Sequence, residues 1–390
     1  MILKKPIMGW NTWNTFGENI NEKLIFEMAD AMVEKGYKDA GYEYIIIDDC
    51  WSEMKRDEDG RLVPDKKKFP NGMKYVSDYV HSKGLKFGMY SDAGFYTCAG
   101  YPASFGHEIE DAQTFAEWGV DYLKYDYGFF PNSAKGDHAY LVMAQALRMT
   151  GRDIVFAACT GGKDNPEDWA RSRGCHTYRS TDDISDAKSS YMRILESQAD
   201  SFEINTFNCY NDMDMLTVGM YGKGNVSGNG PHYHGKCEDD GMKYEDYENH
   251  FLSWAFFGTP LIMGADIRKM DDRCRELLQN RDVIAINQDA ENRPPFRIEK
   301  FYEHAHVFVR LLENGDVAVL ALNFHPETPS QKSLKLKISF DDLGIRTGSG
   351  YGFEVTNVLT GENLGVYEAG YAVPVKSERA VLLRLKAVKI

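Results

Sequence analysis

The amino-acid sequence predicts a (β/α)8 TIM barrel followed by a smaller C-terminal antiparallel β-sandwich domain. Three observations support this fold class. Short apolar runs alternate with amphipathic helical patterns over the first part of the chain, and eight such units form a (β/α)8 barrel. Several of these runs are almost uninterrupted, as in parallel strands that are buried on both faces. After Pro294-Pro295 the pattern changes to short alternating strands joined by turns.

The barrel strands are expected where the apolar runs lie. In chain order they are 6–10, 44–49, 85–90, 120–126, 154–159, 176–180, 204–208 and 261–264. The first long helix begins after Asn21, a residue type that caps helix N-termini. Its apolar stripe is formed by Leu24, Met28, Met32 and Val33. Further helices are expected at 73–82 and at 111–118, the second ending at Gly119.

The predicted domain boundary places the catalytic barrel over 1–293 and the all-β domain over 297–390. In the second domain Asn314-Gly315 separates two alternating strands, and this dipeptide is a strong hairpin signal. The Gly-rich stretch 221–241 is long for a barrel loop. We expect it to form a rim, a lid or a subunit contact. The last of these would make the protein a homo-oligomer.

Composition excludes several classes of protein. The chain carries 45 basic and 59 acidic residues, a net charge of −14. A nucleic-acid partner would need clustered basic residues instead. The chain lacks an uninterrupted apolar run of about 18 residues, so no membrane span is expected. The first eight residues lack the apolar run and cleavage site of a secretory signal, and we expect a cytoplasmic protein.

The seven cysteines include no Cys-X-X-Cys pair, and we expect reduced thiols. A metal site is suggested only by His232, His234 and Cys237. Because these residues lie in the Gly-rich stretch, a surface loop explains them more simply. We therefore expect neither a metal nor another cofactor.

Carboxylates cluster at the predicted carboxyl ends of the strands, where the active site of a (β/α)8 barrel lies. They are Asp48, Asp49, Asp92, Asp126, Asp182, Asp183, Asp212, Asp214 and Asp266. Capping of the following helix could explain any one of them, but it does not explain the whole set. A cluster of carboxylates at this end of the barrel can hold a cation, or it can hold and cleave a polyhydroxylated molecule.

Aromatic residues beside these carboxylates favour the sugar. They are Trp10, Trp13, Trp51, Tyr90, Tyr125 and Tyr210. An aromatic face covers the apolar C–H patch of a sugar, while carboxylates accept hydrogen bonds from its hydroxyl groups. Lys124 precedes Asp126 by two residues and points to the same side of the strand. There it can keep Asp126 ionised and also donate to a substrate hydroxyl.

Five motifs of the barrel resemble glycoside hydrolase family 27, which comprises α-galactosidases and α-N-acetylgalactosaminidases. They are MGWNTW at 8–13, YIIIDDCW at 44–51, GMYSDAG at 88–94, DYLKYD at 121–126 and NDMDML at 211–216. The resemblance covers essentially the whole barrel, and the all-β tail fits the C-terminal domain of the family. It implies an enzyme without a cofactor that releases terminal α-linked galactose from oligosaccharides or glycoconjugates, with retention of configuration.

The resemblance also implies a role for each matching residue. Asp126 matches the nucleophile and Asp183 the general acid/base. Asp48 and Asp49 match the pair that binds the 4- and 6-hydroxyls, and Lys124 matches the lysine that donates to the 3- and 4-hydroxyls. The other matches bind or enclose the sugar: Trp13, Tyr90, Arg179, Asp214 and Met215. Thr160 is expected to bind the sugar at a position where the chain departs from the family.

Retention requires two carboxyl groups about 5–5.5 Å apart whose pKa values are shifted in opposite directions. We expect Lys124 to lower the pKa of Asp126. Acidic neighbours such as Asp214 are expected to raise the pKa of Asp183 once substrate excludes water. Arg179 opposes this rise if it touches Asp183.

The chain departs from the family pattern after the fifth strand. The α-galactosidases that it resembles commonly have Glu-Trp where this chain has Thr160-Gly161, and that Glu reads the 2-hydroxyl. Small residues at this place leave room for an acetamido group in α-N-acetylgalactosaminidases, which are therefore the alternative unless a neighbouring loop fills the space. Asp49 favours a hexose with a 6-hydroxyl over a pentose. Cys159 and Cys175 are both present, so a disulfide between them is one alternative to free thiols.

Two other classes of protein compete with this interpretation. A non-catalytic galactose-binding protein would keep the pocket, but recognition alone would not require an acid at both Asp126 and Asp183. A metal-dependent barrel hydrolase or lyase would use the same carboxylates as metal ligands. The sequence favours the retaining hydrolase over both.

Overall fold

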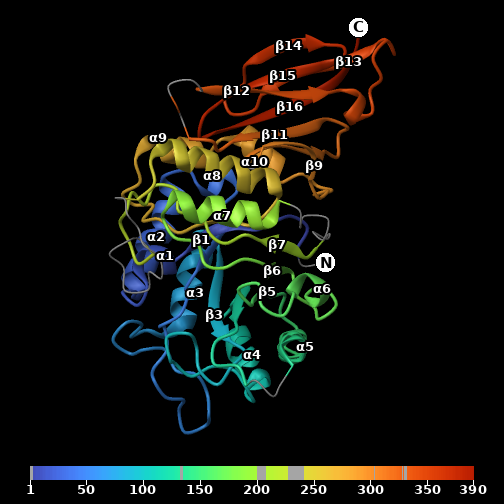
Figure 1. Cartoon of the computed structure of the whole chain (residues 1–390). Coiled ribbons are helices and arrows are strands. Elements are labelled where there is room, and N and C mark those ends of the chain that lie inside the picture. The colour runs from blue at the N-terminus through green and yellow to red at the C-terminus, as the bar shows by residue number, and fades with distance from the viewer. Residues whose placement is uncertain are drawn as a thin grey trace.

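The first domain is a closed barrel of eight parallel strands. The computed structural model describes residues 3–131, 135–199, 208–226, 241–302, 304–326, 328 and 332–390. The strands lie in the order β7-β6-β5-β4-β3-β2-β1-β8, with β8 paired to β1. Leu216, which follows β7, bridges Met263 of β8 and so closes the sheet. The predicted fold class is confirmed, and Figure 1 shows the C-terminal sheets at one end of the barrel domain.

The barrel strands are β1 Met8–Asn11, β2 Tyr44–Ile46, β3 Lys86–Asp92, β4 Tyr122–Asp126, β5 Val155–Cys159, β6 Thr177–Arg179, β7 Tyr210–Asp212 and β8 Leu261–Met263. The helices are α1 Trp13–Phe16, α2 Glu22–Glu34, α3 Gly72–Ser82, α4 Glu108–Glu117, α5 Gly136–Met149, α6 Pro166–Trp169, α7 Lys188–Gln198, α8 Tyr244–Phe257, α9 Asp272–Leu278 and α10 Arg281–Asn287. None of the helices that the structure describes is long and apolar enough to cross a membrane.

The first long helix follows the sequence prediction with one correction. The Asn21 side chain accepts a hydrogen bond from the Leu24 backbone N–H at 2.9 Å and caps α2. Leu24, Met28 and Met32 are buried, but Val33 is 38% exposed. Val33 follows Met32 by one residue, a rotation of about 100° that carries it off the buried stripe. The inclusion of Val33 in the stripe was therefore wrong.

The seventh strand differs from the sequence prediction. Of the expected range 204–208, residues 204–207 lie outside the described residues, and β7 is formed later, by Tyr210–Asp212. This strand is hard to see in the sequence because Asn211 interrupts its apolar pattern. In the structure Asn211 exchanges hydrogen bonds with Ser180 and Gln198, which satisfy its buried amide.

The Gly-rich stretch lies mostly outside the described residues. Only its two ends, 221–226 and 241, belong to the part of the chain that the structure describes. The weak zinc motif of His232, His234 and Cys237 falls within the undescribed part. The expected rim, lid or subunit contact stays a prediction.

The C-terminal domain contains two antiparallel sheets around a shared apolar core. Its strands are β9 Phe296–Tyr302, β10 Ala305–Leu311, β11 Val317–Asn323, β12 Ser333–Ser339, β13 Tyr351–Asn357, β14 Asn363–Tyr367, β15 Gly370–Lys376 and β16 Arg379–Lys389. Six of them form one sheet, while β12 and β15 form the other. The hairpin predicted at Asn314-Gly315 joins β10 to β11, and Gly315 has the left-handed φ of +84° that this turn requires.

Arg310 of β10 ties this domain to the barrel. Its side chain is fully buried, and its Nη1 donates to the Phe256 carbonyl in α8 at 3.0 Å. Its Nη2 donates to the Asn292 side chain. Burial lowers the pKa of Arg310 to about 10, so the guanidinium remains charged at neutral pH. A charged side chain therefore occupies the interior of the domain interface, held by a carbonyl and an amide.

We expect Arg310→Leu to lower the free energy of unfolding by about 3 kcal/mol, because a buried carbonyl and a buried amide lose their donor. Urea denaturation measures this change. The matched control is Arg384→Leu, since Arg384 is 41% exposed and makes its ion pair with Asp316. The control should cost less than about 1 kcal/mol. Equal losses for the two variants would contradict the role assigned to Arg310.

Candidate active site

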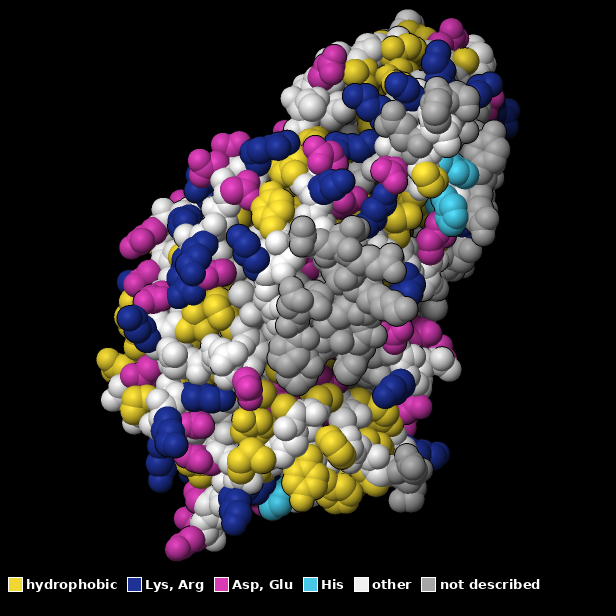
Figure 2. Space-filling model, turned by 60° about the vertical axis from the view of Figure 1, so that its left-hand side comes forward, with side chains coloured by type: hydrophobic (Ala, Val, Ile, Leu, Met, Phe, Trp, Pro, Cys, Tyr) yellow, Lys and Arg dark blue, Asp and Glu magenta, His cyan; other side chains and the backbone are white. Residues whose placement is uncertain are grey.

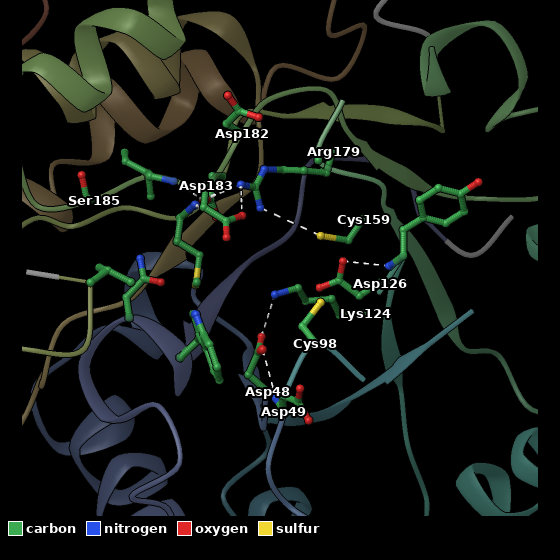
Figure 3. Close-up of a pocket in the computed structure, with 18 of the residues that line it drawn as sticks. Asp48, Asp49, Cys98, Lys124, Asp126, Cys159, Arg179, Asp182, Asp183 and Ser185 are labelled. Atoms are coloured by element: carbon green, nitrogen blue, oxygen red, sulfur yellow. Dashed lines mark hydrogen bonds and ion pairs between the residues drawn. The ribbon is translucent and has the colours of Figure 1, made fainter. Parts of the chain in front are cut away.

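A cavity of about 800 Å³ lies at the carboxyl ends of the barrel strands. It brings together the residues that were given a catalytic or substrate-binding role: Trp13, Asp48, Asp49, Tyr90, Lys124, Asp126, Thr160, Arg179, Asp183, Asp214 and Met215. Figure 3 shows Asp126 and Asp183 reaching its interior, the first from β4 and the second from the segment after β6. Residues far apart in sequence therefore share one concave site.

Several residues proposed from the same pattern do not line the cavity. Trp10 and Trp51 are buried beneath it, where their indole N–H groups donate to the carbonyls of Ala265 and Tyr90. Tyr125 and Tyr210 are also in the core. Of the expected acids, Asp92, Asp212 and Asp266 do not line the cavity either, and Asp266 pairs with Arg268. The four aromatic residues therefore pack in the barrel core and do not form walls of the site. The sequence interpretation was wrong on this point.

Lys124 is held at the cavity floor by Asp48. Its Nζ donates to Asp48 Oδ2 at 2.9 Å, and Asn11 Nδ2 donates to the same oxygen at 2.7 Å. Burial works against the charge of Lys124, but the negative charge of Asp48 raises the pKa of Lys124 well above its usual range. The lysine therefore stays cationic beside Asp126.

Asp126 ends β4 and accepts two hydrogen bonds. The Tyr90 hydroxyl donates to Oδ2 at 3.0 Å, and the Tyr127 backbone N–H donates to Oδ1 at 2.9 Å. Burial raises the pKa of Asp126, and Lys124 opposes that rise. The expected effect of Lys124 is present, but burial outweighs it, so the expectation of a lowered pKa was wrong in its net direction.

Asp92 lies opposite Asp126 in the register of β3 and β4 and is fully buried. Its two carboxyl oxygens accept backbone N–H groups of Gly94 and Gly128, at 2.8 and 2.7 Å. Burial and the charge of Asp126 raise the pKa of Asp92 from 3.8 to about 8. Lys124 opposes the same rise at Asp126, so Asp126 is the acid of this pair whose charged form a cation stabilises.

Arg179 bridges Asp183 and Asp214. Its Nη2 donates to Asp183 Oδ1 at 2.9 Å and to Asp214 Oδ2 at 2.6 Å. Burial raises the pKa of Asp214 to about 6, against the opposing effect of Arg179. The side chain of Asp183 is 82% exposed, so solvent screens its pairing with the arginine. Asp182 pairs instead with Arg193 at 3.2 Å.

The exit of β5 leaves open space. Thr160 is only 2% exposed, yet among the described residues none hydrogen-bonds to its Oγ1. A Cβ atom added at Gly161 would meet nothing within 4 Å. A side chain at Gly161 would therefore project into unfilled space, whereas the Thr160 hydroxyl is covered by the protein.

Sequence reasoning missed several residues of the site. Asn11 holds Asp48, Tyr127 and Cys98 line the cavity, and Ser189 and Arg193 line its outer part. Asn11 could have been found, because it is a polar residue at the carboxyl end of β1. The others lie on loops or on α7, where local sequence gives no sign that they reach the cavity.

The thiols near the site are free. Cys159 and Cys175 are both buried and unbridged, so the disulfide left open by the sequence is not formed. Among the described residues, Asp92, Cys98 and Asp126 are the group whose potential metal-ligating atoms lie within 4.8 Å of one another. Both oxygens of Asp92 already accept backbone N–H groups, which makes this set a poor cation site.

Two family models and several known proteins match most of the chain. The family model described as Alpha galactosidase A matches residues 5–229 and 236–289, and the model of the Alpha galactosidase C-terminal beta sandwich domain matches 303–385. Alpha-galactosidase A of Cellvibrio japonicus (strain Ueda107) is 42% identical over 335 residues, which cover 83% of this chain and 76% of that protein.

Two solved structures are similar over almost the whole chain. Alpha-galactosidase I from Mortierella vinacea is 31% identical, with a TM-score of 0.86, over 98% of this chain and 96% of that one. The α-galactosidase from Saccharomyces cerevisiae with raffinose is 28% identical, with a TM-score of 0.85, over 98% of each chain.

Stability should depend on pH through Asp92. The unfolded chain releases this proton near its ordinary pKa of 3.8, whereas the folded chain retains it up to about 8. The stability that Asp92 contributes is fully present below the first value and is lost as pH rises towards the second. We therefore expect the free energy of unfolding of Asp92→Asn to fall less than that of the wild type between about pH 5 and 8.

Urea denaturation at a series of pH values measures these slopes. The control is Asp182→Asn, because Asp182 is 76% exposed and lies outside the Asp92–Asp126 pair. It should keep the wild-type slope. A slope for Asp92→Asn that equals that of the wild type would show that Asp92 is already ionised in the folded protein.

Proposed function

The chain belongs to glycoside hydrolase family 27, the α-galactosidase family, and on this basis we propose that Asp126 and Asp183 hydrolyse terminal α-galactosides with retention of anomeric configuration. The chain is an O-glycosyl hydrolase that acts on α-galactosides. The observation that carries the assignment of roles is that one cavity contains a charge-stabilised carboxylate at Asp126 and a solvent-accessible carboxyl group at Asp183.

The sugar would bind through the carboxylates at the end of β2. Lys124 donates one of its N–H groups to Asp48, and its other N–H groups can donate to ring hydroxyls. Asp49 accepts backbone N–H groups from Cys50 and Ala99, and these bonds orient its carboxyl group. Trp13 and Met215 lie along the same cavity and supply apolar surface for the C–H face of the sugar.

Hydrolysis would proceed by double displacement. In the first step Asp126 attacks the anomeric carbon, the bond to the leaving oxygen breaks, and Asp183 gives that oxygen its proton. In the second step Asp183 takes a proton from water, which attacks the same carbon and releases the sugar from Asp126. The raised pKa of Asp92 supports this division, because a proton on Asp92 would leave Asp126 as the charged partner.

Arg179 would set the protonation of Asp183. The guanidinium favours the charged form of Asp183, which opposes the action of a general acid. Asp214 shares the same Nη2 group at the shorter distance of 2.6 Å and weakens this hold. Substrate that covers the exposed Asp183 carboxyl would remove its water and raise the pKa of Asp183.

A second candidate substrate is an α-N-acetylgalactosaminide. The observation that favours it is the open space at Gly161, after β5, where an added Cβ atom would meet nothing within 4 Å. An acetamido group at the 2-position would fill that space. The α-galactosidase relatives favour galactose as the principal substrate.

We expect Asp183→Asn to lower kcat/KM about 100-fold or more for a galactoside with a sugar leaving group, since that group must be protonated as it departs. An aryl α-galactoside with an acidic phenol should lose far less. Steady-state kinetics on both substrates make the comparison. The matched control is Asp126→Asn, which removes the attacking group and should abolish turnover of both. Equal losses with Asp183→Asn would reject the acid role.

We expect the wild type to hydrolyse 4-nitrophenyl α-galactoside at least about tenfold faster than 4-nitrophenyl α-N-acetylgalactosaminide, in terms of kcat/KM. The two compounds differ only in the 2-substituent, so the ratio reports on the space beside Thr160. A preference for the acetamido sugar would make the second candidate the principal substrate.

A further inference from the structure

Three aromatic side chains stand exposed beside the cavity. Phe95 and Tyr96, on the loop after β3, are 52% and 54% exposed, and Phe129, after β4, is 61% exposed. Figure 2 shows hydrophobic side chains gathered on the lower part of the face in view. Exposed apolar groups that gather in this way commonly mark a binding surface. We name Phe95, Tyr96 and Phe129 the aromatic platform.

The two loops that carry the platform are locked together. The Phe95 N–H donates to the Phe129 carbonyl at 3.4 Å. A Cβ atom at Gly94 would lie 1.9 Å from the Gly128 carbonyl oxygen, so only glycine permits this close approach. The rings of Tyr96 and Phe129 meet edge to face, with centroids 6.1 Å apart. The platform is therefore a preformed surface, and little ordering would be needed when it binds.

Phe129 occupies this exposed position against its backbone preference. Its φ of +43° lies in the left-handed region, which a bulky residue rarely adopts. Strain of this kind persists where the surroundings hold it in place, and it concentrates at functional sites. Burial of the side chain does not offset the strain, because Phe129 is 61% exposed; its backbone is held by Gly94 and Phe95.

The platform is continuous with the catalytic cavity. Tyr127, next to Asp126, lines the cavity and stacks on Phe130 at 4.8 Å between ring centroids. Phe105 then contacts both Phe130 and Phe95, with centroids 6.1 and 4.6 Å apart. A row of aromatic rings thus leads from beside Asp126 out to the platform.

The surroundings of the platform select an uncharged occupant. The segments 93–106 and 127–131 contain no charged residue. The whole chain has a net charge of −14, and the neighbouring cavity is rich in carboxylates, so an anionic partner would be repelled. Sugar rings are neutral and present apolar C–H faces that pack on aromatic rings.

We propose that the aromatic platform binds neutral sugar residues of the substrate beyond the galactose that is released, so that the protein acts on galactose carried by a longer saccharide. This inference rests on the proposed function and extends it to a class of substrate. The galactose enters the cavity at Asp126, while the part of the saccharide that remains uncleaved lies across Phe129, Tyr96 and Phe95.

The test compares a polymer with a single sugar. The variant is Phe95→Ala with Phe129→Gly, since glycine accepts the φ of residue 129 without strain. We expect kcat/KM for galactomannan to fall about five- to tenfold, as the loss of two aromatic contacts implies. For 4-nitrophenyl α-galactoside, kcat/KM should stay within about twofold, because this substrate is too short to reach the platform.

Matched variants separate the platform from general effects. Tyr351→Ala removes an aromatic ring of similar exposure, 50%, from β13 of the C-terminal domain, and both activities should stay at the wild-type level. Tyr96→Ala provides an independent test if the double variant fails to fold, and it should also reduce activity on galactomannan alone. Equal losses on both substrates, or unchanged activity on galactomannan, would overturn the proposal.

Further measurements identify other occupants of the surface. Sedimentation that shows a dimer in the wild type and a monomer in the double variant, with hydrolysis of galactomannan unchanged, would assign the platform to a second copy of the chain. Platform-dependent binding to neutral phosphatidylcholine vesicles, again with galactomannan unaffected, would assign it to a lipid surface. Either result overturns the proposal.

Failure of the proposed function has a different signature. In that case the wild type would not hydrolyse the aryl galactoside, whereas the platform is still tested by electrophoretic retardation in gels that contain galactomannan. Retardation of the wild type and of Tyr351→Ala, but not of the double variant, would support the platform even then. Equal migration of all three would overturn it.

Discussion

The burial of several carboxyl groups at one end of the barrel is the constraint on which the rest of the site depends. Like charges in a poorly solvated cavity repel one another, so they persist only with cations, hydrogen bonds or protons to offset them. Lys124 contacts Asp48, and Arg179 contacts both Asp183 and Asp214. Lys124 also favours the charged form of Asp126, and Arg179 is shared between Asp183 and Asp214, so each cation is divided between two acids.

The placement of protons follows from this division. Asp126 has a cation, a tyrosine hydroxyl and a backbone N–H, whereas Asp92, directly opposite, has two backbone N–H groups. Burial raises the pKa of both acids, but Lys124 favours the charged form of Asp126, whereas the charge of Asp126 adds to the rise at Asp92. On the other side Asp183 remains exposed to solvent, where a covering substrate can change its protonation. Opposite environments within one cavity are what a paired acid and nucleophile require.

Asp92 also connects the chemistry to the surface beside it. Its oxygens hold Gly94 and Gly128, the two glycines at which the loops after β3 and β4 cross. The same crossing fixes the backbone of Phe129 and presents the aromatic platform. The carboxyl group that takes the proton near Asp126 thus also positions the surface where we place the remainder of the substrate.

The sequence by itself determined the features that depend on local or periodic patterns. Asn21 and Gly315 mark a helix start and a turn through their own backbone and side-chain chemistry. Because parallel strands end at one edge of a barrel, the acids after those strands were expected to meet, and six of the nine do line one cavity: Asp48, Asp49, Asp126, Asp182, Asp183 and Asp214. Only the tertiary structure decided which aromatic rings enter the cavity, that Arg179 touches Asp183, and that burial outweighs Lys124 at Asp126. Burial and ion pairing depend on which distant segments of the chain pack together, and a local sequence pattern does not show this.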